Sequence, residues 1–318
     1  MYKSLLKPAL AAMAVCALIL PAGASAATVA NGDFETGNLN GWQVYNSTNA
    51  GNWFAFNAIQ ASEEKLPPPI AGNFSAYTTE EFPDTAILYQ DVALEPFSTH
   101  QLSLTAGYQS STPIVAPSSL AVGSLPRNPE NQQLRIDVMK PTAPIESIEP
   151  ADILATLFAN KTGDSQVMAP TQFTANLSAF AGQTVRIRIA NAVGDSEFNT
   201  VLDNVSIASA PIPNTISRGK LALNKKKGTG KLTINVPGPG TLTAVSKGKK
   251  KTIKTVNLTA TAAGALKVPL NAVGQGRKAL NNKGKLMAQL AVTFTPTGGA
   301  PNAQIYKITL KKTLPKKR

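Results

Sequence analysis

The chain has 318 residues and a mass of 33.3 kDa, a length typical of about two domains. Hydrophobic residues make up 43% of it and charged residues 15%, with 23 Gly and 23 Pro. This composition excludes a disordered polymer and favours short strands joined by turns. The single His and single Cys argue against a His-ligated zinc site, a Cys-based redox site and a Ser or Cys triad. Hydrolysis by paired carboxylates stays open.

The first 26 residues have the pattern of a secretory signal peptide. Lys3 and Lys7 precede an apolar run at residues 9–20, and the small residues 24–26 follow it. This predicts cleavage before Ala27 and a chain that is secreted, extracellular or associated with the cell surface. The only cysteine, Cys16, leaves with the signal peptide, so the exported chain is expected to fold without a disulfide.

Charge divides the exported chain into two parts. All 18 acidic residues lie within residues 27–208, together with seven basic residues, whereas the chain from Ser209 onward carries 22 Lys and Arg and no acidic residue. The change coincides with Pro211 and Pro213. We therefore expect one domain at residues 27–208, a linker at 209–216 and a basic domain at 217–318.

The first part is predicted to be a β-sandwich. Short alternating or β-branched runs, separated by Gly, Pro and Asn, indicate strands at residues 86–92, 101–108, 134–139 and 184–190. In the last of these, Val185, Ile187 and Ile189 share one face and Arg186 and Arg188 the other, as in a half-buried antiparallel strand.

Two other segments of this part have distinct patterns. Residues 151–158 are the only helix candidate. Residues 110–133 are rich in Pro and Ser and longer than usual loops, which predicts either a functional lid or a mobile insertion.

The motifs at the two ends of this part resemble a known fold family. NGDFETGNLNGW at residues 31–42 and VLDNVSI at 201–207 resemble the opening and closing strands of bacterial galactose-binding-like jelly rolls, the fold of several carbohydrate-binding module families. LSAFAGQTVRIRIA at 177–190 resembles the penultimate stretch of such modules. The resemblance covers residues 27–208 and implies an all-β jelly roll, with a glycan as the ligand of several relatives.

The resemblance also implies a structural calcium ion near the chain ends. Asp33 and Glu35, two apart on the expected opening strand, would point to the same side, and Asp203 would come from the last strand. Three carboxylates with backbone carbonyls form the oxygen set that Ca²⁺ prefers. The alternative is that these acids are solvated strand-end residues or turn formers.

A sugar site needs an aromatic platform on which a pyranose ring can stack. The candidates are Trp53, Tyr77, Tyr89 and Tyr108. Trp42, which follows a glycine at the end of the opening motif, is expected in the core. For each candidate the alternative is a partly buried strand aromatic.

Catalysis by two carboxylates is not favoured by the pairs Glu63–Glu64 and Glu80–Glu81. Neighbours in an extended strand point to opposite faces, so neither pair can converge on one bond. The single His100 has no evident Ser, Cys or carboxylate partners in the sequence. We therefore predict a protein that is not an enzyme.

The basic part is also predicted to be β. Strands are expected at residues 231–236, 241–245, 252–258, 265–270, 286–294 and 304–310, with a tight turn at PGPG, residues 237–240. Their even spacing suggests an immunoglobulin-like sandwich. KLTINVPGPGTLTAV and VTFTPTGG resemble the Lys-rich β domains of secreted actinobacterial surface proteins over about residues 217–312.

The basic residues of this part cluster in turns, at residues 225–227, 247–251 and 316–318. Of the 22, 19 are Lys, and only Phe294 and Tyr306 could stack on bases. This favours sequence-blind attraction to polyanions over specific nucleic-acid recognition. The partner could be a wall polymer bearing phosphate or uronate, an anionic membrane surface, or the acidic part of another copy. Alternatively, the basic residues only keep the protein soluble and have no fixed partner.

Two functions follow from the sequence. In the first, the acidic jelly roll binds a glycan at the cell surface and the basic domain associates with anionic envelope polymers. In the second, the chain is a structural or adhesive surface protein without a small-molecule ligand, and its oppositely charged domains attract each other between copies.

Overall fold

The structure is a computed structural model that describes residues 28–48, 51–63, 66–79, 83–116, 119–120, 132–194, 196–248 and 250–315. The predicted signal peptide, Glu64, Glu80, Glu81 and the basic residues 316–318 therefore lie outside the described residues. So does most of the predicted loop at residues 110–133, including all of 121–131.

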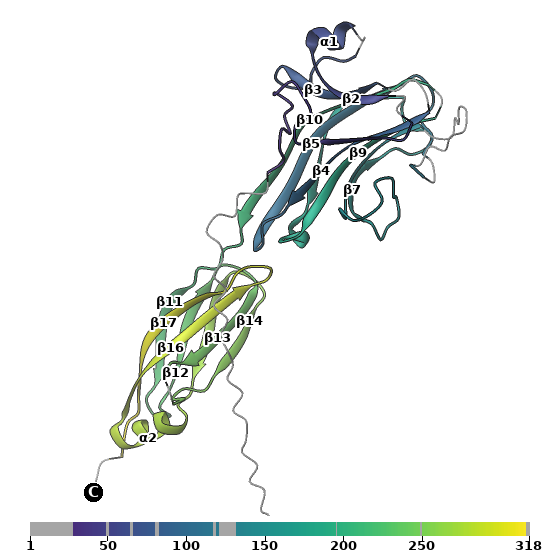
Figure 1. Cartoon of the computed structure of the whole chain (residues 1–318). Coiled ribbons are helices and arrows are strands. Elements are labelled where there is room, and N and C mark those ends of the chain that lie inside the picture. Colours follow the sequence, from purple (N-terminus) through teal and green to yellow (C-terminus); the bar gives the residue numbers. More distant parts are fainter. Residues whose placement is uncertain are drawn as a thin grey trace, which may run out of the picture.

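The protein is all-β, and its described strands form antiparallel sheets that pack as two β-sandwiches (Figure 1). No sheet of the described residues mixes strands that precede Ile212 with strands that follow Ile216. Each sandwich has its own cluster of buried apolar side chains. None of the helices in the described residues is long and apolar enough to span a membrane.

The first sandwich consists of two five-stranded sheets, each named here after its central strand. The β9 sheet has the order β1 (Gln43–Asn46), β4 (Asp84–Ala93), β9 (Thr184–Val193), β6 (Gln132–Met139) and β7 (Ile153–Ala159). The β10 sheet has the order β2 (Asn52–Asn57), β3 (Phe74–Thr79), β10 (Phe198–Pro211), β5 (Ser98–Ser110) and β8 (Val167–Asn176). Two short helical elements connect these strands, α1 (Ala58–Glu63) and the 3-10 helix η1 (Ser178–Phe180).

The alternation of apolar residues places the core between the two sheets. Ile187 and Ile189 of β9 are fully buried, and Leu102 and Leu104 of β5 belong to the same cluster from the opposite sheet. Alternate side chains of a strand point to opposite faces, so the intervening residues of β5 form the outer face of the β10 sheet.

Two predictions for this sandwich are wrong. Residues 151–158, predicted to be a helix, form most of β7, which pairs with β6; sheet pairing overrides the local helix preference. The opening motif at residues 31–42 is a series of turns, because Asn31 and Phe34 have φ values of 49° and 54°. The side-chain alternation expected for Asp33 and Glu35 is therefore absent.

The connection between the sandwiches is shorter than predicted. Strand β10 continues through residues 208–211, which pair with residues 98–101 of β5. Beyond it, the Ile212 amide donates to the Phe97 carbonyl at 2.9 Å, and the Asn214 side-chain amide donates to the Ala300 carbonyl at 3.0 Å. The segment outside the strands, residues 212–216, thus contacts both sandwiches.

The second sandwich has seven strands in two sheets. One sheet has the order β11 (Ser217–Asn224), β12 (Thr229–Val236) and β15 (Gly264–Leu270). The other has the order β14 (Val256–Ala260), β13 (Gly240–Ser246), β16 (Lys285–Pro296) and β17 (Asn302–Lys311). Leu232, Leu242 and Phe294 are fully buried between them. The immunoglobulin-like classification stays a prediction.

Two elements of this sandwich, β11 and the helix α2 (Gly274–Lys283), were not predicted from the sequence. The third predicted strand starts four residues too early, since only the isolated bridge of Ile253 with Ala272 precedes β14. The helix ends at Gly284, whose φ of 64° allows its amide to bond the Leu280 carbonyl.

Arg188 is fully buried, although its alternation with apolar residues predicts an exposed position. Its guanidinium donates to the Asp137 carboxylate at 2.5 Å and to the carbonyls of Ile145 and Ser147 at 2.7 Å. The segment between β6 and β7 therefore covers this part of the β9 sheet. Burial lowers the pKa of Arg188, and the charge of Asp137 opposes that shift.

Removal of the Asp137 charge is expected to destabilise the first sandwich strongly. In Asp137→Asn the buried guanidinium of Arg188 loses its counter-charge, which should lower the free energy of unfolding by about 3–5 kcal/mol. Asp91→Asn is the matched control, because Asp91 pairs with Arg186 while 33% exposed and should cost at most about 1 kcal/mol. Denaturant unfolding of both variants measures the difference; equal losses would contradict this account of the buried pair.

Candidate functional site

The candidate site lies on the outer face of the β10 sheet, where cross-strand pairing aligns residues from four strands. Tyr77 of β3 pairs with Phe54 of β2 and with Val201 of β10, and Val201 pairs in turn with Gly107 of β5. Paired residues point to the same face. One row of the sheet therefore carries two aromatic rings, an isopropyl group and a position without a side chain. Tyr77 and Val201 are buried there against Ala61 and Leu66.

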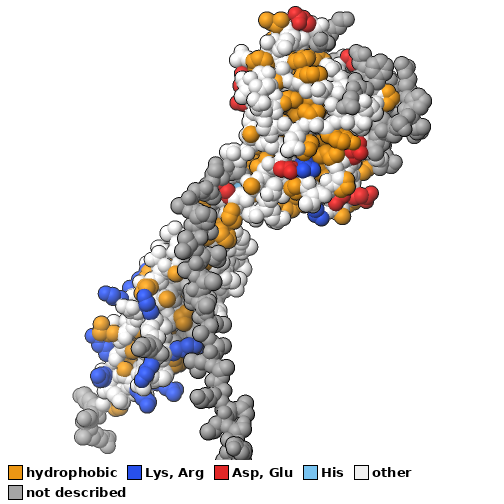
Figure 2. Space-filling view, in the orientation of Figure 1, with side chains coloured by type: hydrophobic (Ala, Val, Ile, Leu, Met, Phe, Trp, Pro, Cys, Tyr) orange, Lys and Arg blue, Asp and Glu red, His pale blue; other side chains and the backbone are white. Residues whose placement is uncertain are grey.

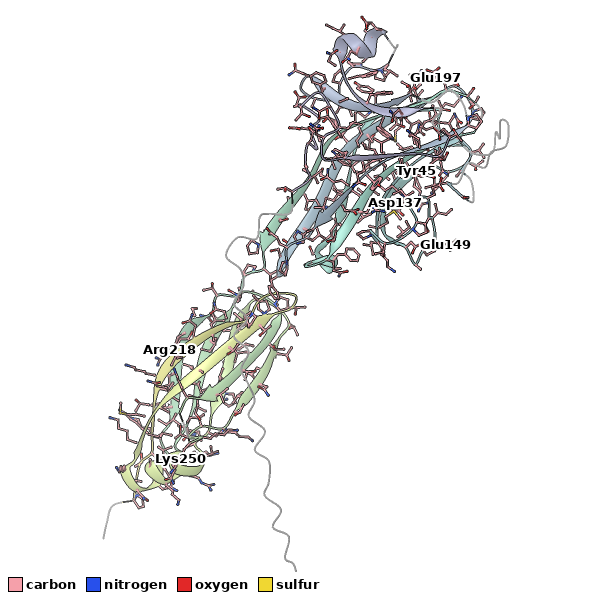
Figure 3. All side chains as sticks on the ribbon, viewed as in Figure 1. Tyr45, Asp137, Glu149, Glu197, Arg218 and Lys250 are labelled. Atoms are coloured by element: carbon pink, nitrogen blue, oxygen red, sulfur yellow. The ribbon has the colours of Figure 1, made fainter. Side chains whose placement is uncertain are left out.

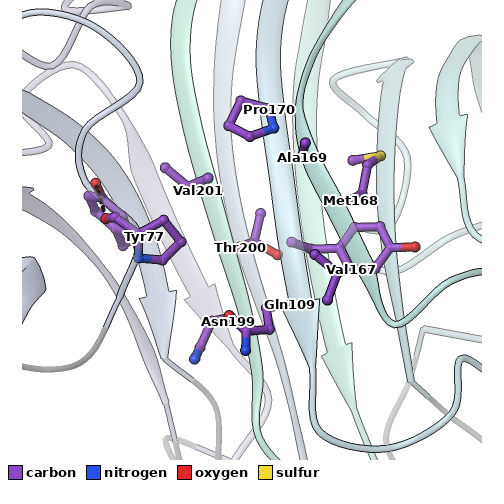
Figure 4. Close-up of a pocket in the computed structure, with 11 residues that line it drawn as sticks. Tyr77, Gln109, Val167, Met168, Ala169, Pro170, Asn199, Thr200 and Val201 are labelled. Carbon is purple, nitrogen blue, oxygen red and sulfur yellow. Dashed lines mark hydrogen bonds between the residues drawn. The ribbon is translucent and has the colours of Figure 1, made fainter.

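A pocket of about 130 Å³ opens on this face (Figure 4). It is smaller than the roughly 300–1,000 Å³ of sites that enclose drug-sized ligands, so it suits one ring or substituent of a larger molecule. Apolar groups make up most of its lining, and the side-chain amides of Gln109 and Asn199 supply polar atoms. Its residues are Pro67, Tyr77, Tyr108, Gln109, Val167, Met168, Ala169, Pro170, Asn199, Thr200 and Val201.

Gly107 determines how closely β8 approaches this row. A Cβ atom at residue 107 would lie 2.9 Å from the Met168 carbonyl oxygen and 3.0 Å from the Pro170 nitrogen. The register of β5 and β8 also shifts between Ala106 and Tyr108. The absence of a side chain at Gly107 thus lets the backbone of β8 form one wall of the pocket.

Asn199 contributes an acceptor that has no hydrogen-bond partner among the described residues. Its Nδ2 donates to the Glu197 carboxylate at 2.7 Å, whereas its Oδ1 is buried and accepts no hydrogen bond from the part of the chain that the structure describes. Asn199 is 8% exposed. A buried acceptor without a donor costs free energy, and a donor supplied by a bound ligand would remove that cost.

The predicted platform residues do not form one platform. Tyr77 and Tyr108 both line the pocket, but Trp53 is buried in the core, where its indole N–H donates to the Ala86 carbonyl. Tyr89 belongs to the β9 sheet, with the Arg186 guanidinium 4.7 Å from its ring centroid. Tyr108 shares the core cluster of Trp53, so the four side chains do not present their rings on one common surface.

The two tyrosines offer little free ring surface. Tyr77 is 1% exposed and donates from its hydroxyl to the Pro67 carbonyl; burial raises its pKa to about 12. The Tyr108 ring stacks on Phe198 in the core with centroids 5.2 Å apart, and its hydroxyl donates to the Ser165 carbonyl. Both rings line the pocket, but neither is an exposed stacking surface.

Phe54 and Phe56 are aromatic residues of this face that sequence analysis missed. Their rings stack with centroids 5.4 Å apart, and Phe56 lies 6.0 Å from Tyr77. Both are partly exposed. The signal was the two-residue spacing in NWFAFN, which separates these two rings from the buried Trp53 by strand alternation.

Two of the predicted calcium ligands, Glu35 and Asp203, are held by hydrogen bonds from other parts of the chain. The Glu35 carboxylate accepts from the backbone amides of Asn73 and Phe74, and Asp203 accepts from Ser75 and two backbone amides. Within the described residues, no three His, Cys, Asp or Glu side chains are grouped so as to hold a metal ion.

These donors take up part of the acceptor capacity of Glu35 and Asp203, and a calcium ion bound by the three carboxylates stays a prediction. The pKa values of these two carboxyl groups shift in opposite directions. Hydrogen bonds from Phe74 and Asn73 lower the pKa of Glu35, while burial raises the pKa of Asp203. Asp33 is exposed and only accepts from the Glu35 amide.

His100 has partners that its sequence neighbours do not reveal. It is 1% exposed; its Nδ1 lies 2.8 Å from Ser209 Oγ and its Nε2 lies 2.8 Å from the Glu95 carbonyl. His100 and Ser209 are register partners on β5 and β10. His100 therefore links β5 to β10 through Ser209 and to the β4–β5 connection through Glu95.

Comparisons with known proteins identify no family. No protein family and no curated protein matches the chain. Among solved structures, TmCBM61 in complex with β-1,4-galactotriose is 13% identical over 59% of this chain and 100% of its own, with a TM-score of 0.36. The adhesin domain of Epf from Streptococcus pyogenes is 12% identical over 92% of this chain and 99% of its own, with a TM-score of 0.30. The Endo-D glycoside hydrolase domain from Streptococcus pneumoniae is 12% identical over 85% of this chain and 37% of its own, with a TM-score of 0.29.

Glu35→Gln is expected to destabilise the protein equally in calcium and in chelator. The carboxylate is held by N–H donors, and its lowered pKa means that it stabilises the fold at neutral pH. That contribution is lost as the pH falls through the lowered pKa, so the difference between the variant and the parent chain should shrink in acid. Thermal melting over pH, with and without calcium, measures both effects. A loss seen only with calcium would support the calcium site and contradict this interpretation.

Proposed function

We propose that the chain is a secreted, non-catalytic protein that binds a carbohydrate on the outer face of the β10 sheet. The observation that carries this proposal is the pocket between β3, β10 and β8, in which apolar walls adjoin the amides of Gln109 and Asn199. Sugar recognition uses this combination, because a pyranose has an apolar C–H face and hydroxyl groups at its rim.

Each wall of the pocket has a defined part in the proposal. Val167, 58% exposed, and the exposed Pro170 would contact the C–H groups of the sugar. The exposed amide of Gln109 would bond hydroxyl groups, and a ligand O–H or N–H would donate to the unpartnered Asn199 Oδ1. The partly exposed ring of Phe54 extends the apolar surface beyond the pocket.

The second sandwich would hold this site at the cell surface. The chain from Ser209 onward has 22 basic and no acidic residues, and such a surface attracts anionic envelope polymers. The opposite charges of the two sandwiches favour a second function, a structural or adhesive protein that associates with other copies of itself and has no small-molecule ligand.

Val167→Ser is expected to weaken glycan binding about tenfold, the factor that corresponds to about 1.4 kcal/mol of lost apolar contact. The experiment is a glycan array probed with the chain from Ala27, followed by titration of the best glycan. About 1 M salt shortens the Debye length to ~3 Å and suppresses attraction by the basic sandwich.

Val44→Ser is the matched control, because Val44 is a 38% exposed valine on β1 of the other sheet. The Val44→Ser variant should bind the glycan with the same affinity as the parent chain. A folded chain that binds no glycan on the array would contradict the first function and favour the adhesive one. Equal weakening by the two substitutions would place the glycan elsewhere.

A further inference from the structure

The topology of the second sandwich gathers its basic connections at one end. β11, β13, β15 and β17 end there, and β12, β14 and β16 begin there, as the antiparallel registers require. The β11–β12 turn, the β13–β14 connection and α2 therefore meet at this end, which we call the cationic end. Its Lys and Arg residues are Lys225, Lys226, Lys227, Lys247, Lys250, Lys251, Lys254, Arg277, Lys278, Lys283, Lys285, Lys311 and Lys312.

The opposite end of the same sandwich carries no charge. Its connections are residues 237–239, 261–263 and 297–301, and none contains a Lys, Arg, Asp or Glu. The uncharged residues 212–216 lead from the first sandwich to this end. Figure 2 shows blue side chains gathered toward the α2 end of this body, and Figure 3 places Lys250 there and Arg218 nearer the linker.

The cationic end has no internal counter-charge. Each ion pair found among the described residues lies in the first sandwich. Lys285 and Lys311 are direct register partners on β16 and β17, and like charges in that position repel. With the exception of Lys312, which is half-buried and donates to Asn281, these cations are exposed. The fold thus bears a repulsion that a bound anion would relieve.

Backbone hydrogen bonds join the segments of the cationic end into one surface. The Thr313 amide donates to the Lys225 carbonyl at 2.9 Å, and the Val273 amide donates to the Thr252 carbonyl at 2.9 Å. The Lys312 amide donates to the Gly284 carbonyl at 2.8 Å. The lysines therefore project from a fixed platform, unlike those of a flexible tail.

We propose that the cationic end is the docking surface for a linear anionic polymer with phosphate or carboxylate groups in its repeat. Ammonium groups are point charges that attract such groups without regard to sequence, and the described part of the cationic end offers no aromatic ring for base stacking. The inference rests on the proposed association with envelope polymers and assigns it to one end, which leaves the β10 sheet free.

The test compares two variants of the chain from Ala27 that carry the same net charge. The first replaces Lys226, Lys227, Lys250 and Lys251 at the cationic end with Gln. The matched control replaces Arg218, Lys220, Lys267 and Lys307, exposed residues on the strands, with Gln. Binding to inorganic polyphosphate and to polygalacturonate is titrated over a range of salt concentrations, after circular dichroism shows that both variants are folded.

The cationic-end variant should bind roughly 10- to 100-fold more weakly, with a salt slope shallower by about 3, because four contacts are lost at roughly 0.7 each. The control should stay within about threefold of the parent chain. Binding to polyphosphate alone assigns phosphate as the ligand group, and binding to polygalacturonate alone assigns carboxylate. Either result supports the cationic end as the docking surface.

Three results would overturn the inference. Equal weakening of the two variants would show that net charge, and not the cationic end, governs binding. Tighter binding of single-stranded DNA than of polyphosphate at equal charge would assign the surface to nucleic acid. Failure of the parent chain to bind either polymer at low salt would overturn the proposed association itself, without affecting the glycan site.

Discussion

The candidate site depends on the register in which β10 pairs with β3 on one side and β5 on the other. This register places Val201 beside Tyr77 and Gly107, and Asn199 beside Gln109, on the outer face. A slip of one residue would turn these side chains toward the core. The pocket, its unpartnered acceptor and the approach of β8 over Gly107 all follow from this one alignment.

The strand positions could be predicted from sequence wherever one face is apolar, because burial enforces a period of two. Val185, Ile187 and Ile189 lie in the core as that pattern requires. The same pattern does not predict what covers the other face of the strand. There the segment between β6 and β7 covers Arg188, and Asp137 of β6 pairs with it. Residues 153–158 form a strand because β6 pairs with them, and this partner is not part of the local sequence.

Only part of the site could be predicted from the sequence, because contacts across the sheet decide which side chains meet. Tyr77 and Tyr108 could be placed on strands, but which face each ring takes depends on register, and Trp53 and Tyr108 both take the inner one. The hydrogen bonds that hold Glu35 come from residues 73 and 74, and the contact of His100 with Ser209 comes from across the sheet. Such contacts are absent from local spacing. The charge of a segment, by contrast, follows from its residues alone and does not depend on strand register. The acid-free second part could therefore be identified directly.

Cross-strand nuclear Overhauser effects in β10 test this account most directly, because they report register without reference to any ligand. The account predicts backbone contacts from Val201 to Tyr77 and to Gly107, and from Asn199 to Gln109. Contacts from Val201 to Ala76 or Thr78 instead would shift the pairing by one residue. That result would separate Val201 and Asn199 from the face that carries Tyr77 and contradict the site.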